Sequence, residues 1–239
     1  MIRCLVFAIV AAASAQQPSE KIQFEVVSIK PGDPTDGSSS ARSTPGGMQM
    51  RNTTLTNLIR GAYGLNEFQL SGGPKWADSA KFHVDAKLPA GAKREDMQLM
   101  MRNMLADRFN LEFHRETRTL PEYALLVAKG GIKIPALGPD DPKQQGTSQG
   151  PRSIQVNGFE LSTLARMLIS VVGAPVIDRT ELKGYYKIKL QHQPFQGAAP
   201  DDEMPTIFAA LAQIGLRLEP IKGPVEVLVI DRAEMPSEN

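Results

Sequence analysis

The sequence predicts an α+β protein made of two duplicated βαββαββ-like units, with helices packed on mostly antiparallel sheets. Four segments repeat their apolar residues with the period of an α-helix, and shorter segments between them alternate apolar and polar residues. The helical segments start near Leu55 and Met97 in the first half, and near Leu161 and Ile207 in the second. This similar spacing indicates an ancient duplication, and α+β units of this size pack their helices on one face of a sheet.

Each of the four predicted helices carries an apolar stripe wide enough to face a core. Thr54 is a suitable N-cap for the first of them, because its hydroxyl can accept a hydrogen bond from a backbone N–H in the first turn. The helices are expected at residues 55–63, 97–109, 161–172 and 207–214.

Alternating segments predict strands that bury one face. They cover residues 24–29, 81–86, 111–115, 123–128, 185–190, 216–219 and 225–230. Stretches rich in Pro, Gly and polar residues predict loops at 31–47, 130–152 and 194–205. The middle loop is the best linker, so the predicted organisation is a first unit at 22–130, a linker at 131–152, a second unit at 153–233 and a tail at 234–239.

The N-terminus predicts a cleavable secretory signal peptide at residues 1–15, followed by a flexible start at 16–21. Arg3 gives a positive charge, residues 5–13 form an apolar run, and Ala13 and Ala15 are the small residues that a signal peptidase reads. The run is well short of the ~20 residues that span a bilayer. A buried first strand or an uncleaved anchor is the alternative. A cleaved leader implies an exported protein, periplasmic or extracellular.

Composition excludes several classes of function. Cys4 is the only cysteine and lies in the leader, so the mature chain is expected to have no disulfide, thiolate nucleophile or cysteine metal site. The chain has 27 basic and 26 acidic residues, and this balance gives no electrostatic footprint for nucleic acid. No apolar run after the leader approaches spanning length, which predicts no transmembrane segment after signal cleavage. No cofactor is expected.

Motifs along the chain resemble one protein family. They are FEVVSIKP at 24–31, TLTNLIRGAYGL at 54–65, QLSGGPKWADSAKFHVDAK at 69–87, MLADRFNLEFHRETRTLPEYALLVAKGG at 104–131, APVIDRTELKGYY at 174–186 and VEVLVIDRAEMPSEN at 225–239. On these motifs the chain is identified as a member of the large paralogous family of uncharacterised secreted proteins first described from soil Acidobacteria. The resemblance implies export and a shared fold, and it implies no activity.

Each half also resembles, more weakly, the short periplasmic domain at the N-terminus of secretins and of TonB-dependent signal-transducing receptors. Residues 159–231 carry this resemblance best, through a helix, a Gly turn, a strand, a second helix ending in Gly-Leu and a pair of strands. In those proteins the module is a protein-interaction domain without catalysis. The likeness is one of fold, which by itself is a weak guide to function.

Motifs for nucleophilic, metal and phosphate chemistry are missing from the sequence. It contains no HExxH, no G-x-S-x-G and no phosphate-binding glycine loop. Glu112, His114 and Glu116 share one face of a predicted strand and could form a weak metal site. An exposed face of mixed charge explains the same pattern better, because zinc sites require more convergent His or Cys ligands. No catalytic or metal-binding residue is therefore assigned.

Trp76, Arg115, Glu116 and Arg118 are the candidate binding residues. Trp76 is the only tryptophan, and tryptophan is enriched at binding hot spots, although packing of its turn against a sheet is the more common role. The segment Arg115–Pro121 links two predicted strands and carries alternating charge. It can be a docking surface for a partner or an anionic ligand, or a hairpin connection held by surface ion pairs, which contribute little to stability.

The leading hypothesis is a non-catalytic interaction or ligand-binding module of the cell envelope, with an envelope protein or an extracellular ligand as its partner. Its strand edges could bind that partner by β-augmentation. The alternative is an extracytoplasmic hydrolase that uses paired carboxylates, drawn from Asp85, Glu112, Glu116 and Asp178. A regulatory or inhibitory partner of a membrane protease or sensor is a third possibility, which shares the features of the first.

Overall fold

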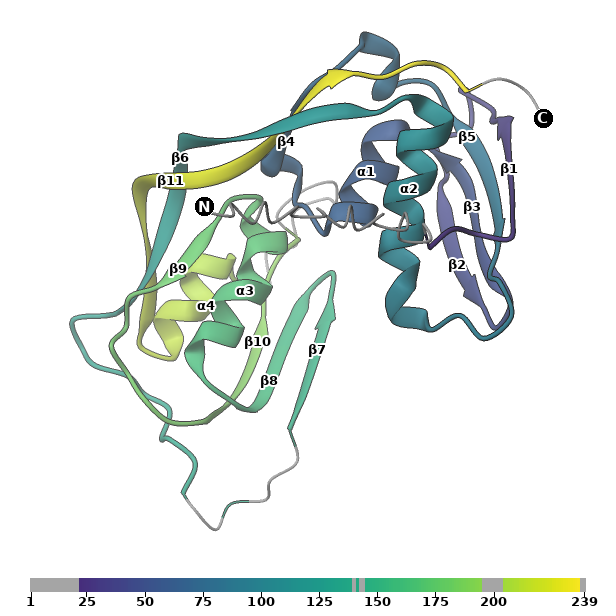
Figure 1. The fold of residues 1–239 in the computed structure, drawn as a ribbon. Coiled ribbons are helices and arrows are strands. Elements are labelled where there is room, and N and C mark those ends of the chain that lie inside the picture. Colours follow the sequence, from purple (N-terminus) through teal and green to yellow (C-terminus); the bar gives the residue numbers. More distant parts are fainter. Residues whose placement is uncertain (1–21, 139–140, 142–144, 195–203, 237–239) are drawn as a thin grey trace, which may run out of the picture.

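The computed structural model describes residues 22–138, 141, 145–194 and 204–236. Within these ranges it contains four α-helices and eleven β-strands in mostly antiparallel sheets, which confirms the predicted α+β class. The predicted signal peptide, the flexible start and most of the loop at 194–205 lie outside the described residues. The elements form two lobes beneath a long two-stranded ribbon (Figure 1).

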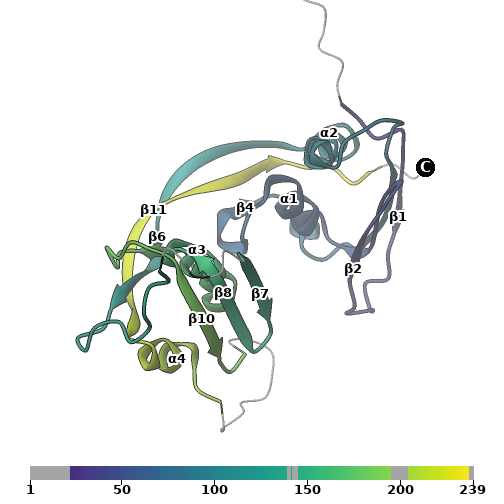
Figure 2. The same cartoon turned by 90° about the horizontal axis from the view of Figure 1, so that it is seen from below.

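The ribbon consists of the antiparallel strands β6 (Glu112–Val127) and β11 (Leu216–Arg232). These strands pair from end to end, from Val127 opposite Leu216 to Glu112 opposite Arg232. At ~3.3 Å per residue, strands of this length extend about 50 Å. The ribbon is therefore long enough to pass over both lobes, as Figures 1 and 2 show.

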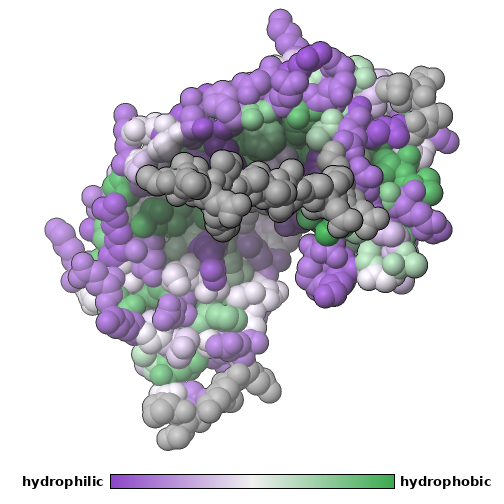
Figure 3. Space-filling model, in the orientation of Figure 1, coloured by the Kyte–Doolittle hydropathy of each residue, from purple (hydrophilic) through white to green (hydrophobic). Residues whose placement is uncertain are grey.

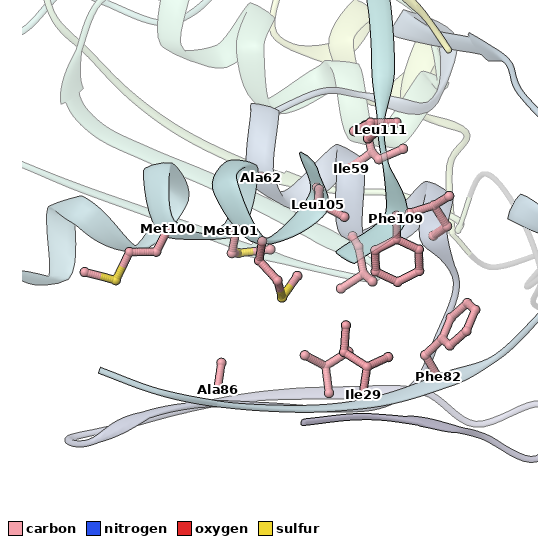
Figure 4. Close-up of a cluster of buried hydrophobic side chains, with 14 of the residues drawn as sticks. Ile29, Ile59, Ala62, Phe82, Ala86, Met100, Met101, Leu105, Phe109 and Leu111 are labelled. Carbon is pink, nitrogen blue, oxygen red and sulfur yellow. The ribbon is translucent and has the colours of Figure 1, made fainter. Parts of the chain in front are cut away.

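The N-terminal lobe combines a four-stranded sheet, in the order β1–β5–β3–β2, with two helices. Its elements are β1 (Val26–Pro31), β2 (Ser40–Thr44), β3 (Gly47–Thr53), β5 (Phe82–Lys87), α1 (Leu55–Tyr63) and α2 (Met97–Phe109), and the short strand β4 (Leu70–Gly72) pairs with β11. Figure 4 shows Met101 and Phe109 of α2 above Ile29 and Phe82 of the sheet. Leu228 and Ile230 of β11 belong to the same core.

The C-terminal lobe has a three-stranded sheet in the order β10–β8–β7 and two further helices. Its elements are β7 (Gly146–Gly150), β8 (Ser153–Phe159), β10 (Tyr186–Gln191), α3 (Leu161–Val172) and α4 (Ile207–Gln213), and the short strand β9 (Val176–Asp178) pairs with β6. The second core includes Leu125 of β6 and Leu216 of β11. The ribbon therefore contributes side chains to both cores.

The two halves of the chain repeat one order of elements. The series β3–α1–β4–β5–α2–β6 corresponds to β8–α3–β9–β10–α4–β11. The short strand of each half pairs with the ribbon strand of the other half. β4 lies parallel to β11, and β9 lies parallel to β6. The duplication itself and the boundaries of the two units stay predictions. Since both halves supply strands to the ribbon, neither core is built from one half alone.

Four predicted strands are wrong in their extent, because they are joined into two. Residues 111–115 and 123–128 are joined in the single strand β6, so that Arg115–Pro121 is strand and not a connection. Residues 216–219 and 225–230 are joined in β11 in the same way. Pro121 in the first segment, and Pro220, Gly223 and Pro224 in the second, are ordinary turn signals, which explains the predicted breaks.

The ribbon accommodates its prolines because of their position in the ladder. The N–H of Tyr123 points away from β11 and donates to the carbonyl oxygen of Pro175 at 2.8 Å. Pro121 lies two residues earlier, so the position of its missing N–H also faces outward. On the other strand, Pro220 pairs with Tyr123 and Pro224 pairs with Thr119. Both are non-hydrogen-bonded pairs, because such pairs recur at every second residue of an antiparallel ladder. No ladder bond is lost at these prolines.

Parts of two predicted loops are also strands. β2 lies within residues 31–47, and β7 lies within residues 130–152, inside the predicted linker. Both are exposed edge strands with small or polar side chains. A strand that buries neither face has the composition of a loop, so alternation does not reveal it.

Candidate functional site

A cleft of about 660 Å³ lies between the two lobes beneath the ribbon. A volume of this size is typical of ligand-binding clefts, which occur preferentially between domains. Figure 3 shows hydrophilic side chains along the ribbon and hydrophobic ones beneath it. The residues lining this interlobe cleft are Arg60, Asn66, Glu67, Phe68, Gln149, Gly150, Pro151, Ile169, Ser170, Val171, Gly173, His192 and Pro194.

His192 reaches the interlobe cleft from the end of β10 and is only 1% exposed. Its backbone N–H donates to the carbonyl oxygen of Arg152 at 3.0 Å, which holds it beside the β7–β8 turn. Its ring Nδ1 lies 2.7 Å from the backbone oxygen of Gln193. A carbonyl oxygen can only accept, so Nδ1 carries the proton and Nε2 of the neutral ring is an acceptor. Nε2 is buried and has no hydrogen-bond partner among the described residues.

Arg60 reaches the same cleft from the last turn of α1, in the other lobe. Its Nη1 is 3.5 Å from Oδ1 of Asn57, at the outer limit of a hydrogen bond. Its Nε is buried without a partner in the part of the chain that the structure describes. A guanidinium group only donates hydrogen bonds. Two residues that line the interlobe cleft therefore each carry one buried polar atom without a partner, a donor on Arg60 of one lobe and, in the neutral ring, an acceptor on His192 of the other.

The elements around these two groups are held in place by contacts within each lobe. Gln149 Nε2 donates to Ser170 Oγ at 2.7 Å and so ties β7 to the end of α3. The ring of Tyr63, at the end of α1, packs edge-on against Phe113 of β6 with 5.0 Å between centroids. Burial raises the pKa of Tyr63, and the guanidinium of Arg102 lies over its ring at 4.8 Å. These contacts hold β7 against α3 and the end of α1 against the ribbon.

The family model for "Protein of unknown function (DUF3738)" matches residues 56–233, a range that includes Arg60, His192 and the whole ribbon. The chain belongs to this family. The match confirms the predicted membership of an uncharacterised family. No curated protein and no solved structure matches this DUF3738 chain. The weaker resemblance of each half to the secretin module stays a prediction.

The four predicted binding residues of the DUF3738 chain lie outside the interlobe cleft. Trp76 packs edge-on against Phe82, with 6.4 Å between ring centroids, at the border of the first core. Arg115 pairs with Glu226 across the ribbon, and Arg118 pairs with Glu116 on the same strand. The structure thus brings Glu116 and Arg118 together on the exposed ribbon and places Trp76 in the N-terminal lobe. Their role in binding stays a prediction.

The histidine considered for metal binding lies close to two carboxylates on the ribbon. His114 Nδ1 lies 2.8 Å from Oδ1 of Asp231, and its Nε2 lies 3.9 Å from Oε2 of Glu116. Among the residues that the structure describes, no three His, Cys, Asp or Glu side chains are grouped so that they could hold a metal ion.

No described helix is long and apolar enough to cross a membrane.

The carboxylates considered for hydrolysis lie on β5, β6 and β9. Asp85 pairs with Arg51 at 2.8 Å in the sheet of the N-terminal lobe. Asp178 lies opposite Leu125 at the far end of β6, which places it ~30 Å along that strand from Glu116. Glycosidase carboxylates are about 5–10 Å apart. Asp178 and Glu116 are therefore too far apart to form the catalytic pair that the alternative hypothesis requires.

Sequence reasoning missed both groups that define the interlobe cleft. His192 continues the alternation of Tyr186, Ile188 and Leu190, all of which are buried. That alternation is the signal that could have placed the histidine on an inward face. Arg60 has no such signal, because it lies beside the apolar stripe of α1 and only the approach of the other lobe places it in a cleft.

Proposed function

We propose that this DUF3738 protein is a non-catalytic interaction or ligand-binding module, and that it binds its ligand in the interlobe cleft. The observation that carries the proposal is the pair of buried, unpartnered atoms, Arg60 Nε and His192 Nε2, in one cleft but on different lobes. A buried polar atom without a partner costs about 1–3 kcal/mol. A ligand that pairs with both atoms recovers this free energy on binding.

The place of action that we propose is outside the cytoplasm. The support is the N-terminal sequence, where a positive charge, an apolar run and small residues follow one another as in a secretory leader. An envelope protein or an extracellular ligand is the partner that such a location makes accessible.

Arg60→Ala tests whether the cleft is the binding site. The purified protein is screened by thermal shift against peptides, oligosaccharides and small organic acids, and a ligand that raises the Tm is titrated against the variant. We expect the variant to bind about tenfold more weakly, because a hydrogen bond from a charged donor contributes about 1.5–3 kcal/mol. Arg42→Ala, which removes an exposed arginine from β2 outside the cleft, serves as the control and should bind as the wild type does.

Three outcomes contradict the proposal. Equal affinity of Arg60→Ala and the wild type would move the site away from the interlobe cleft. Failure of every ligand class to shift the Tm would remove the support for a binding module. Release of shortened products from a screened peptide or oligosaccharide would favour the hydrolase instead.

A further inference from the structure

The strand β7 presents an open edge beside the interlobe cleft. It is the terminal strand in the order β10–β8–β7, and its residues Gln149 and Gly150 line the cleft. Figures 1 and 2 agree that β7 is the strand of the C-terminal lobe nearest to the N-terminal lobe. Within the described ranges, no backbone group of another element pairs with its outer side.

The register of β7 shows which of its backbone groups face outward. Gly150 pairs with Ser153 across a two-residue turn, and the pair that closes such a turn is hydrogen-bonded. Hydrogen-bonded and non-hydrogen-bonded pairs alternate along an antiparallel ladder. Ser148 therefore bonds to β8, whereas Thr147 and Gln149 direct their N–H and C=O groups away from β8.

The other edge strands of five or more residues carry features that discourage strand addition, which are charged side chains and proline. β1 contains Lys30 and Pro31, β2 contains Arg42, and β10 contains Lys187. β7, with the sequence GTSQG, contains no charged residue and no proline. β7 is also the edge strand that lines the interlobe cleft. Its open edge therefore borders the same cleft as Arg60 and His192, which carry the unpaired atoms.

The chemistry of the cleft matches a peptide backbone. Arg60 offers a donor and His192 offers an acceptor, and the edge of β7 offers both at every second residue. An extended peptide carries N–H and C=O groups with this same two-residue repeat. A simple anion supplies acceptors alone, whereas a peptide backbone also supplies the N–H donor from which Nε2 of a neutral histidine ring accepts.

We propose that the interlobe cleft binds an extended peptide segment of a partner protein, which adds a strand to β7 and hydrogen-bonds to Arg60 and His192. The inference rests on the proposed function and names the class of its ligand. Main-chain bonds to Thr147 and Gln149 supply affinity, and alternate side chains of the peptide supply specificity. Phe68 and Val171 give the cleft an apolar part, so at least one inward side chain of the peptide is apolar.

Thr147→Pro tests the strand addition. Proline removes the outward N–H of residue 147 and places its ring on the edge, while the bonds from β7 to β8 are kept. Peptides are selected from a displayed library of random dodecapeptides on the immobilised protein, synthesised, and titrated against each variant. We expect affinity to fall about tenfold or more in Thr147→Pro. Thr147→Ala keeps the N–H and should bind within about twofold of the wild type.

Amide hydrogen exchange gives a signature that a change in folding does not imitate. Without peptide, the amides of Thr147 and Gln149 should exchange fast, and the amide of Ser148 should exchange slowly because it bonds to β8. Adding a selected peptide should slow exchange at Thr147 and Gln149 about tenfold or more and leave Ser148 unchanged. Uniform protection of the three amides, or none, would overturn the strand addition.

The variants separate this inference from the proposed function. Weaker binding in both Thr147→Pro and Arg60→Ala supports both. Weaker binding in Arg60→Ala alone overturns the peptide proposal and keeps the binding module. The same conclusion follows if the protein enriches no peptide but binds another class of ligand in the cleft. Full binding in both variants overturns both. A thermal melt within a few degrees of the wild type verifies that Thr147→Pro is folded.

Discussion

Replacing Gly215 with alanine is expected to lower the free energy of unfolding by about 3 kcal/mol. Gly215 precedes β11 with a φ of 82°, where a side chain is strained. A Cβ atom there would lie 2.1 Å from the backbone oxygen of Gly131 and 2.9 Å from Cα of Ile132. The obstructing atoms are backbone atoms, and Lys133 N donates to the carbonyl oxygen of Ile214 at 2.9 Å. The neighbouring segment therefore cannot move without breaking that contact.

Gly61→Ala is the matched control for this prediction. Gly61 is exposed within α1, and an added Cβ would meet Cε of Met101 at an ordinary distance of 3.7 Å. Alanine is favoured over glycine in a helix, so this variant should gain about 0.5–1 kcal/mol. Urea unfolding measures both differences. A Gly215→Ala variant as stable as the wild type would contradict the close approach between the start of β11 and residues 131–133.

The isolated fragment 22–130 is expected not to fold cooperatively, although it contains the whole predicted first unit. It lacks β11, which pairs with β6 along its entire length. It also lacks Leu228 and Ile230, which are 1% and 4% exposed in the first core. Each buried side chain of this size contributes about 1.5–3 kcal/mol, against a total stability of about 5–15 kcal/mol for a domain. Circular dichroism should show a broad melt without a sharp transition.

Adding the missing strand in trans gives the control for the fragment. A synthetic peptide of residues 216–236 should restore a cooperative melt, because it supplies both the ladder and the core side chains of β11. The same peptide with Leu228→Asp should fail, because it places a charge in the core. A sharp two-state transition of the fragment alone would show that the first unit is autonomous and that the shared ribbon is dispensable for it.

Local rules were sufficient for the helices. Thr54 Oγ1 accepts a hydrogen bond from Asn57 N at 3.2 Å, as the sequence predicted, and α1 ends before Gly64, whose φ is 65°. The helices α2 and α3 occupy residues 97–109 and 161–172, as expected. Caps and apolar periodicity depend on neighbouring residues, so they can be recognised without knowledge of the rest of the chain.

The ribbon shows where local rules fail. Pro121 indicates a break when its own segment is considered, yet it continues a strand because it pairs with Lys222, far away in the sequence. The exposed strand β7 resembles a loop for a related reason, since only its pairing with β8 makes it a strand. In both cases the deciding hydrogen bonds come from a partner that the local pattern does not contain.

The sequence by itself determined the α+β class, the positions of the helices and the faces that they bury, because these follow from periodicity and capping over a few residues. The tertiary structure alone decided the site. Arg60 and His192 belong to different lobes and are unremarkable within their own segments. They share a cleft because β6 and β11 pair across both cores and hold the lobes beside each other. Contacts between distant segments set that arrangement, and no local pattern encodes it.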